Sequence, residues 1–228
     1  MIQNNQSILL KFKELYNSNI VYFFWFSLFL FIGGFLLYKI PFGSEFLFFN
    51  PIKIDFFNYF FRFFTLLGEA YIFIIVFFLL LYQKSHYTYL IPIIGGLVSL
   101  VVWITKKTFV QFRPYEYMDE YDWMNQIKLV PDVYMNSGDT SMPSGHTLSA
   151  FAIFTILAFI IKNNKVFWNT LLFFCALLVG VSRVYLVQHF LKDIYTGAFF
   201  GVLLATFVYL CFDIFFVDVN GKNKNKIV

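Results

Sequence analysis

Six long apolar stretches dominate the pattern of hydrophobic and polar positions along the chain. A helix needs about 20 residues, and no fewer than about 17, to cross the hydrocarbon core of a membrane. The pattern therefore predicts an all-α, polytopic membrane protein with six transmembrane helices, the fourth of which is short by this rule. The predicted spans are about 19–39, 66–82, 88–105, 146–161, 166–186 and 193–212.

The polar segments between these stretches differ in length. Residues 83–87 and 162–165 form short basic connections, whereas residues 106–145 form the large extramembrane segment. No internal repeat is evident, so we expect a single membrane-integrated domain over residues 1–228. The first apolar stretch is too long for a signal peptide, and no small-residue cleavage site follows it.

Composition agrees with a membrane location. Hydrophobic residues make up 60% of the chain and charged residues 13%, about half the charged share of a soluble domain. The mean hydropathy is +0.70. The net charge of +4 is small and does not point to nucleic acid as a partner. Cys175 and Cys211 lie inside apolar stretches, where packed thiols are more common than a disulfide or a metal site.

The distribution of lysines predicts an orientation. Cytoplasmic segments of membrane proteins carry an excess of basic residues, so we place both termini in the cytoplasm and residues 106–145 outside. The lysines on the predicted cytoplasmic side are Lys11, Lys13, Lys84, Lys162, Lys165, Lys222, Lys224 and Lys226.

Three polar clusters lie at the ends of the predicted spans, where polar side chains are costly and therefore informative. The first follows the third span, the second precedes the fourth, and the last joins the fifth and sixth. Counting the crossings places all three on one side of the membrane, whichever way the protein is oriented. The clusters are Lys106-x6-Arg113-Pro114, Pro143-Ser144-Gly145-His146 and Ser182-Arg183-x5-His189-x3-Asp193.

The spacing within the clusters predicts their local geometry. Seven residues turn a helix by about 700°, so Lys106 and Arg113 would share a face at the end of the third span. Pro114 would then end that helix. His189 and Asp193 lie one helical turn apart, so the carboxylate can accept a hydrogen bond from one ring nitrogen and leave the other free.

Two further features complete the expected site. Arg183 and His189 would not share a helical face, so we expect a break near Val187–Gln188, with His189 at the start of the sixth span. Residues 144–146 lie where the fourth span begins, and the backbone N–H groups of a helix start, helped by the hydroxyl of Ser144, can bind an anion.

Together these groups are the ones that phosphoryl transfer without a metal requires. Three cations and the helix-start amides would neutralise a phosphate and its transition state. One imidazole would attack phosphorus and the second would protonate the leaving alkoxide. Water would then hydrolyse the phosphohistidine. No cysteine and histidine cluster with metal-ligand spacing occurs in the sequence, so we expect neither a metal nor another cofactor.

The three clusters resemble the signature of the type 2 phosphatidic acid phosphatase superfamily at every position. The six-span layout is similar to the membrane branch of that family over about residues 19–212. The resemblance implies that His189 is the nucleophile, Asp193 its orienting partner and His146 the general acid and base. The phosphate-binding residues that it implies are Lys106, Arg113, Ser144, Gly145 and Arg183.

The resemblance also implies a lipid phosphatase of the bacterial inner (cytoplasmic) membrane, with its site facing the periplasm or cell exterior. Bacterial membrane members act on undecaprenyl diphosphate, phosphatidylglycerol phosphate, phosphatidate or lipid A phosphates. A six-span chain without an added domain is most similar to those that act on undecaprenyl diphosphate. Two alternatives stay open: a phosphotransferase that passes phosphate between lipids, and a non-catalytic membrane transporter or scaffold.

Two features are candidates for accessory roles. Glu69 lies at the start of the second span, where a carboxylate can either pair with a cationic group of the site or reach interfacial water. The loop 115–134 is rich in aromatic and acidic residues. Its aromatic side chains are typical of the lipid headgroup layer. We also consider that the segment 115–142 forms a lid that selects the headgroup.

Overall fold

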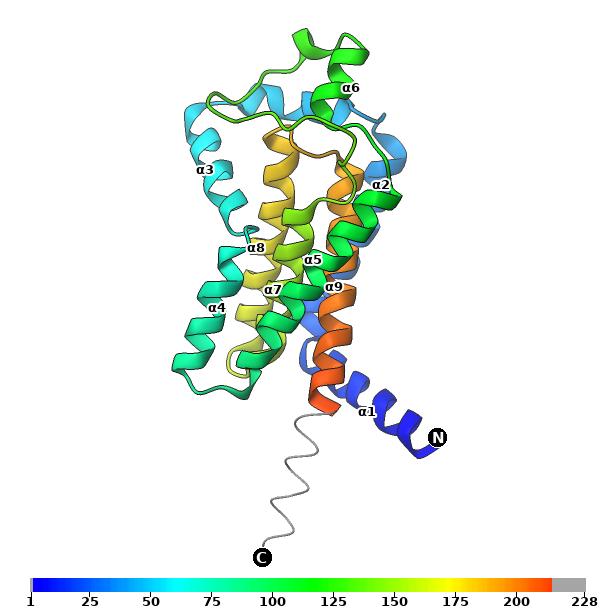
Figure 1. Ribbon diagram of the computed structural model, residues 1–228, viewed down its shortest axis with the longest axis vertical. Helices are drawn as coiled ribbons and strands as arrows, with labels where there is room; N and C mark the ends of the chain where they lie inside the picture. The colour runs from blue at the N-terminus through cyan, green and yellow to red at the C-terminus, as the bar shows by residue number, and fades with distance from the viewer. Residues whose placement is uncertain (1, 215–228) are drawn as a thin grey trace, which may run out of the picture.

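The structure is a computed structural model that describes residues 2–214, and it consists of helices joined by loops (Figure 1). Within these residues the only extended pairing is a single bridge between Gln111 and Thr140. The prediction of an all-α protein is therefore confirmed. The helices are α1 (Ile2–Ser18), α2 (Ile20–Lys39), α3 (Asp55–Leu66), α4 (Tyr71–Tyr82), α5 (Leu90–Thr108), α6 (Pro114–Glu120), α7 (Gly145–Ile160), α8 (Lys165–Tyr185) and α9 (Leu191–Phe212), with 3₁₀ turns η1 (Ser44–Ile52), η2 (His86–Tyr89) and η3 (Met124–Gln126).

Four helical segments among the described residues are long and apolar enough to cross a membrane: α2, η2 with α5, α8 and α9. The expected second span, 66–82, is not one straight helix, because α3 and α4 are bent by 59° at a short break. This bent pair can count as a fifth span. Helix α7 is apolar but has only 16 residues. The number of six spans therefore stays a prediction.

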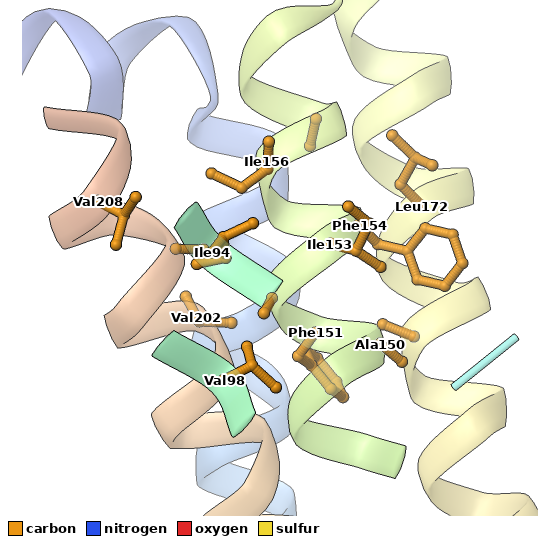
Figure 2. Packing of buried hydrophobic residues seen from close by; sticks show 14 of the residues in the cluster. Ile94, Val98, Ala150, Phe151, Ile153, Phe154, Ile156, Leu172, Val202 and Val208 are labelled. Atoms are coloured by element: carbon orange, nitrogen blue, oxygen red, sulfur yellow. The ribbon is translucent and has the colours of Figure 1, made fainter. Parts of the chain in front are cut away.

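Helix α7 lies at the centre of the helix bundle, against α5, α8 and α9 (Figure 2). Its 16 residues extend about 24 Å, less than the hydrocarbon thickness of about 30 Å. Most of its side chains, including Phe151 and Ile153, are buried by neighbouring helices. Because protein surrounds α7, its ends need not reach the two membrane surfaces.

Two glycines allow α9 to approach α7 closely. A Cβ atom at Gly201 would lie 2.7 Å from the carbonyl oxygen of Leu148, and one at Gly197 would lie 2.8 Å from that of Ser144. Small residues four apart are a common means of bringing helix backbones together in membranes. The start of α9 is thereby held beside the start of α7, where two of the polar clusters lie.

The 3₁₀ turn η1 packs over the start of α9 and is fastened to the loop after η3. Glu45 Oε1 accepts a hydrogen bond from the Leu191 N–H at 2.9 Å, and burial raises the pKa of Glu45. The ammonium groups of Lys53 and Lys128 each donate to the other residue's carbonyl oxygen. Burial lowers the pKa of Lys53 to about 8. These contacts form a cap over the bundle end that carries α6 (Figure 1).

The opposite end of the bundle holds the N-terminal helix, the end of α9 and the α7–α8 connection (Figure 1). Lys11 Nζ and Asp213 Oδ2 form an ion pair at 2.6 Å that joins α1 to the end of α9. Cys175 and Cys211 are unpaired thiols, as expected. The lysines predicted as a cytoplasmic tail, at 222, 224 and 226, lie outside the described residues.

Candidate active site

The connection between α8 and α9 supplies the nucleophile candidate. Helix α8 ends at Tyr185, and Val187 has a positive φ of 57°. The Arg183 carbonyl then accepts hydrogen bonds from the N–H groups of Gln188 and His189, at 2.8 and 3.2 Å. The break predicted near Val187–Gln188 is therefore present. It places His189 two residues before the first residue of α9, with extended backbone at Phe190, so His189 and Asp193 do not share the helical turn that their spacing predicted.

Asp193 lies in the first turn of α9 and is fully buried. Its carboxylate accepts hydrogen bonds from Ser141 Oγ (2.5 Å), Gln111 Nε2 (3.0 Å) and the Phe190 N–H (3.0 Å). His189 Nδ1 lies 3.3 Å from Asp193 Oδ2. Because all these partners donate, the carboxylate is an acceptor toward His189 as well.

The contact with Asp193 defines the state of the His189 ring. A proton on Nδ1 that points to the carboxylate leaves the lone pair on Nε2, which is the nucleophilic form. His189 is 2% exposed, and burial lowers its pKa to about 4 against the opposing effect of Asp193. The ring is therefore neutral at physiological pH.

Lys106 and Arg113 do not share a helix, which corrects the prediction made from their spacing. Helix α5 ends at Thr108, and Arg113 has extended backbone immediately before α6. Pro114 is the first residue of α6 rather than the end of α5, a position that its fixed φ favours.

The segment between α5 and α6 is held by the loop before α7. The N–H groups of Gln111 and Arg113 donate to the carbonyl oxygens of Asp139 and Gly138, both at 2.8 Å, and the Ser141 N–H donates to Gln111 O at 3.1 Å. This pairing joins the first cluster to the second. Burial lowers the pKa of Arg113, while the nearby Asp193 raises it.

The three cations of the motifs converge on one place. Lys106 lies within electrostatic range of Arg113, Arg183 and Asp193. Arg183 is 7% exposed, and its Nη1 donates to Thr65 Oγ1 at 2.7 Å. Across the part of the chain that the structure describes, Arg183 Nε is buried without a hydrogen-bond acceptor. A buried guanidinium with an unused donor is suited to bind an anion.

Ser144 and its neighbours begin α7. The fully buried Ser144 side chain caps the helix, because its Oγ accepts from the Thr147 N–H at 3.4 Å and from Thr147 Oγ1 at 2.9 Å. The Ser144 N–H donates to the Asp193 carbonyl at 3.0 Å, so it is not available to bind an anion. The N–H groups of Gly145 and His146 are the first in the helix, and no carbonyl four residues earlier in α7 pairs with them.

Glu69 is beside the site, at the break between α3 and α4. Its Oε1 lies 2.8 Å from His146 Nε2. Glu69 therefore contacts the general acid candidate rather than one of the three cations expected as its partner. The two side chains are partly open, with exposures of 44% for Glu69 and 26% for His146.

A cavity of about 310 Å³ opens beside these residues. One wall comes from α3 and the α3–α4 break, through Arg62, Thr65 and Glu69. Another part of the lining comes from the loop 132–136, which Gln188 holds through a hydrogen bond from its Nε2 to Tyr134 O at 2.9 Å. His146 and Arg183 line the same cavity. A phosphate group in this cavity would meet the general acid candidate and one of the cations.

Sequence reasoning missed Gln111, Ser141 and Thr65, which hold Asp193 and Arg183 in place. Two of them lie close to a cluster in the sequence: Gln111 lies inside Lys106-x6-Arg113, and Ser141 lies two residues before Pro143. Neither position is part of the motif, and Thr65 is far from all three clusters. Among residues 2–214 no group of three or more His, Cys, Asp or Glu side chains is placed to hold a metal ion.

Comparison with known proteins agrees with this arrangement. Residues 86–216 match the PAP2 superfamily as a protein family. The chain belongs to the PAP2 superfamily. This confirms the resemblance inferred from the motifs, and all three motifs lie within the matched PAP2 region.

Individual PAP2 relatives are similar over shorter stretches. The probable lipid phosphate phosphatase 4 of Arabidopsis thaliana is 35% identical over 98 residues, which are 38% of this chain and 32% of that protein. Phosphatidylglycerophosphatase B of Bacillus subtilis is 31% identical over 92 residues, 36% of this chain and 44% of that protein. The chain thus matches less than half the length of these relatives. The crystal structure of LpxE from Aquifex aeolicus superposes with a TM-score of 0.57 at 25% identity, over 72% of this chain and 92% of that one.

Proposed function

We propose that this protein is a metal-independent lipid phosphatase that hydrolyses a phosphomonoester or diphosphate of a membrane lipid through a phosphohistidine on His189. The observation that carries the proposal is the position of a buried, neutral His189 against Asp193, with three motif cations converging beside it. The named lipid phosphatases among the PAP2 relatives support the same reaction class.

In the proposed reaction, Lys106, Arg113 and Arg183 bind the phosphate together with the first amides of α7. His189 Nε2 forms a bond to phosphorus as the bond to the lipid oxygen breaks, and His146 donates a proton to that oxygen. His146 then takes a proton from water, whose oxygen attacks phosphorus and releases His189. Inorganic phosphate and the lipid alcohol, or the lipid monophosphate, are the products.

We propose undecaprenyl diphosphate as the substrate, with phosphatidylglycerol phosphate, phosphatidate and lipid A phosphate as the other candidates. Arg62 is a cation outside the three motifs and lines the cavity together with Arg183. This additional positive charge would strengthen the binding of a second phosphate next to the transferred one. The apolar exterior of the bundle supports a substrate whose chains stay in the bilayer while its phosphate enters the cavity.

The test is phosphate release by detergent-purified protein from a panel of these four lipids in the presence of EDTA. We expect release without an added acceptor lipid, fastest from undecaprenyl diphosphate. His189→Ala should reduce release at least about 1000-fold, as loss of a catalytic nucleophile does. His86→Asn is the matched control, because this third histidine lies in η2, at the other end of α5 from Lys106.

Three other results of the phosphate-release assay would contradict parts of the proposal. Full activity of the His189→Ala variant would exclude His189 as the nucleophile. Release that requires a second lipid as acceptor would identify a phosphotransferase. Absence of release from all four lipids would contradict the phosphatase proposal and favour the non-catalytic alternative.

A further inference from the structure

The break between α3 and α4 brings a residue outside the family motifs into contact with the general acid candidate. Glu69 Oε1 and His146 Nε2 are 2.8 Å apart, although the residues are 77 positions apart in the chain. A carboxylate can only accept in such a contact, so Nε2 carries the proton. The other ring nitrogen of His146, Nδ1, is thereby left to exchange a proton with a substrate.

The break itself is packed against His146. A Cβ atom at Gly68 would lie 2.8 Å from the His146 carbonyl oxygen and 2.9 Å from the His146 Cβ atom. The absence of a side chain at Gly68 therefore allows the close approach that places Glu69 next to the ring. Thr65, at the end of α3, accepts the hydrogen bond from Arg183 Nη1 at 2.7 Å. One short segment thus supports both a phosphate-binding cation and the general acid.

The two histidines of the site are each oriented by one carboxylate, but through different nitrogens. Asp193 faces Nδ1 of His189, whereas Glu69 faces Nε2 of His146. We propose that Glu69 is a positioning residue that orients His146 and stabilises its protonated ring for proton transfer to the leaving oxygen. This proposal rests on the proposed function, and it adds to that function a residue outside the three motifs.

The charge of Glu69 matters at one step of the reaction. The positive charge of a protonated His146 ring is disfavoured by the burial of the ring and by repulsion from Arg183 and Lys106. The carboxylate of Glu69 offsets this repulsion. When the bond between phosphorus and the lipid oxygen breaks, the Nδ1 proton moves to that oxygen and the ring becomes neutral. The ring then takes its next proton from the attacking water.

A purely structural role for the pair would have a different consequence. If Glu69 only held the break between α3 and α4 in place, its loss would reduce the activity on every substrate by the same factor. If it acts through the general acid, its loss should matter only where the leaving oxygen needs a proton. Alkoxides need one, whereas a nitrophenolate leaves readily without it. The leaving group therefore separates the two roles.

The experiment compares dodecyl phosphate with a nitrophenyl phosphate that carries the same dodecyl chain. The measured quantity is kcat/KM, which reports the steps up to formation of the phosphohistidine. For Glu69→Gln we expect about a 10- to 100-fold loss on dodecyl phosphate, which is part of the roughly 100- to 10,000-fold that a general acid contributes, and less than about a threefold loss on the nitrophenyl ester. Glu69→Asp should recover part of the loss.

Two companion variants complete the design. His146→Gln should show the same dependence on the leaving group, and adding Glu69→Gln to it should cause no further loss, because residues that act as a unit are not additive. Glu120→Gln, which removes an exposed acid of α6, is the control for a change of charge and should behave as wild type.

The outcomes separate this proposal from the proposed function. Equal losses on both esters, or no loss on either, would overturn the role of Glu69 and leave the phosphatase assignment intact. The conclusion is the same if the loss caused by His146→Gln depends on the leaving group and the loss caused by Glu69→Gln does not. A wild-type protein that releases phosphate from neither ester nor from any lipid of the panel would overturn both proposals.

Discussion

At the scale of single residues, the two histidine and carboxylate pairs differ most in their burial. The side chains of His189 and Asp193 are 3% and 0% exposed, whereas those of His146 and Glu69 are 26% and 44% exposed. A buried neutral ring is suited to attack phosphorus, since no water shell has to be removed from it. A ring that remains in contact with water is suited to exchange protons with it.

The lowered pKa of His189 gives a direct prediction. Its pKa of about 4, against an ordinary value of about 6.5, means that the ring should stay neutral between pH 5 and 8. The chain has three histidines, so a variant with His86→Asn and His146→Asn leaves only the ring of His189. We expect its NMR signal not to titrate across this range.

The same shift has a consequence for stability. Between about pH 6.5 and pH 4 the unfolded chain binds a proton at His189 and the folded protein does not. The free energy of unfolding therefore decreases as the pH falls through this range.

The NMR titration can also contradict the prediction. A titration midpoint near 6.5 would contradict both the burial of the His189 ring and its assignment as a neutral nucleophile.

At the scale of elements, α7 and α9 together determine the geometry of the site. The start of α7 carries Ser144 and His146, and the start of α9 carries Asp193. The Ser144 N–H donates to the Asp193 carbonyl at 3.0 Å, which joins the two helix starts directly. The close packing at Gly197 and Gly201 keeps the helices in this register.

Substitution of Gly201 tests this packing. In Gly201→Ala the new methyl group would meet the Leu148 carbonyl at 2.7 Å, so we expect a loss of about 1–3 kcal/mol in the free energy of unfolding. Gly96→Ala is the matched control in α5, because its Cβ would have no neighbour within 4 Å, and alanine favours a helix over glycine. The measurement is the midpoint of thermal unfolding of each variant in detergent. Equal midpoints for Gly201→Ala and Gly96→Ala would contradict the tight α7–α9 contact.

At the scale of the whole molecule, the bundle has two different ends. One end carries the α6–α7 connection and the site, and the other carries α1 and the α7–α8 connection (Figure 1). This arrangement agrees with the counting of crossings that placed the three motifs on one side. The direction in which the protein lies in its membrane is a proposal, with the site facing the periplasm or cell exterior.

Cysteine labelling tests that direction. In a background in which Cys175 and Cys211 are replaced by alanine, Ser137→Cys lies in the α6–α7 connection and Asn163→Cys in the α7–α8 connection, both at exposed positions. A membrane-impermeant maleimide applied to intact cells should label the cysteine at 137, and the one at 163 only after permeabilisation. The reverse pattern would place the site in the cytoplasm.

The three motifs could be recognised from the sequence because each of them is local. His189 and Asp193 are only four positions apart, and the break near Val187 likewise involves residues only a few positions apart. The apolar stretches likewise predicted the all-α class, because a membrane requires long helices whose backbone hydrogen bonds are internal. The PAP2 match confirms the family that these motifs indicated.

The way in which distant segments meet could be seen only in the folded molecule. The helix expected to continue from Lys106 to Arg113 ends at Thr108, because the backbone beyond it pairs with residues 138–141. The contact between Glu69 and His146 depends on a bend between α3 and α4 that the apolar pattern of 66–82 did not reveal. Periodicity reports the face that a helix buries, whereas a bend and a long-range hydrogen bond arise from what the rest of the chain packs against it.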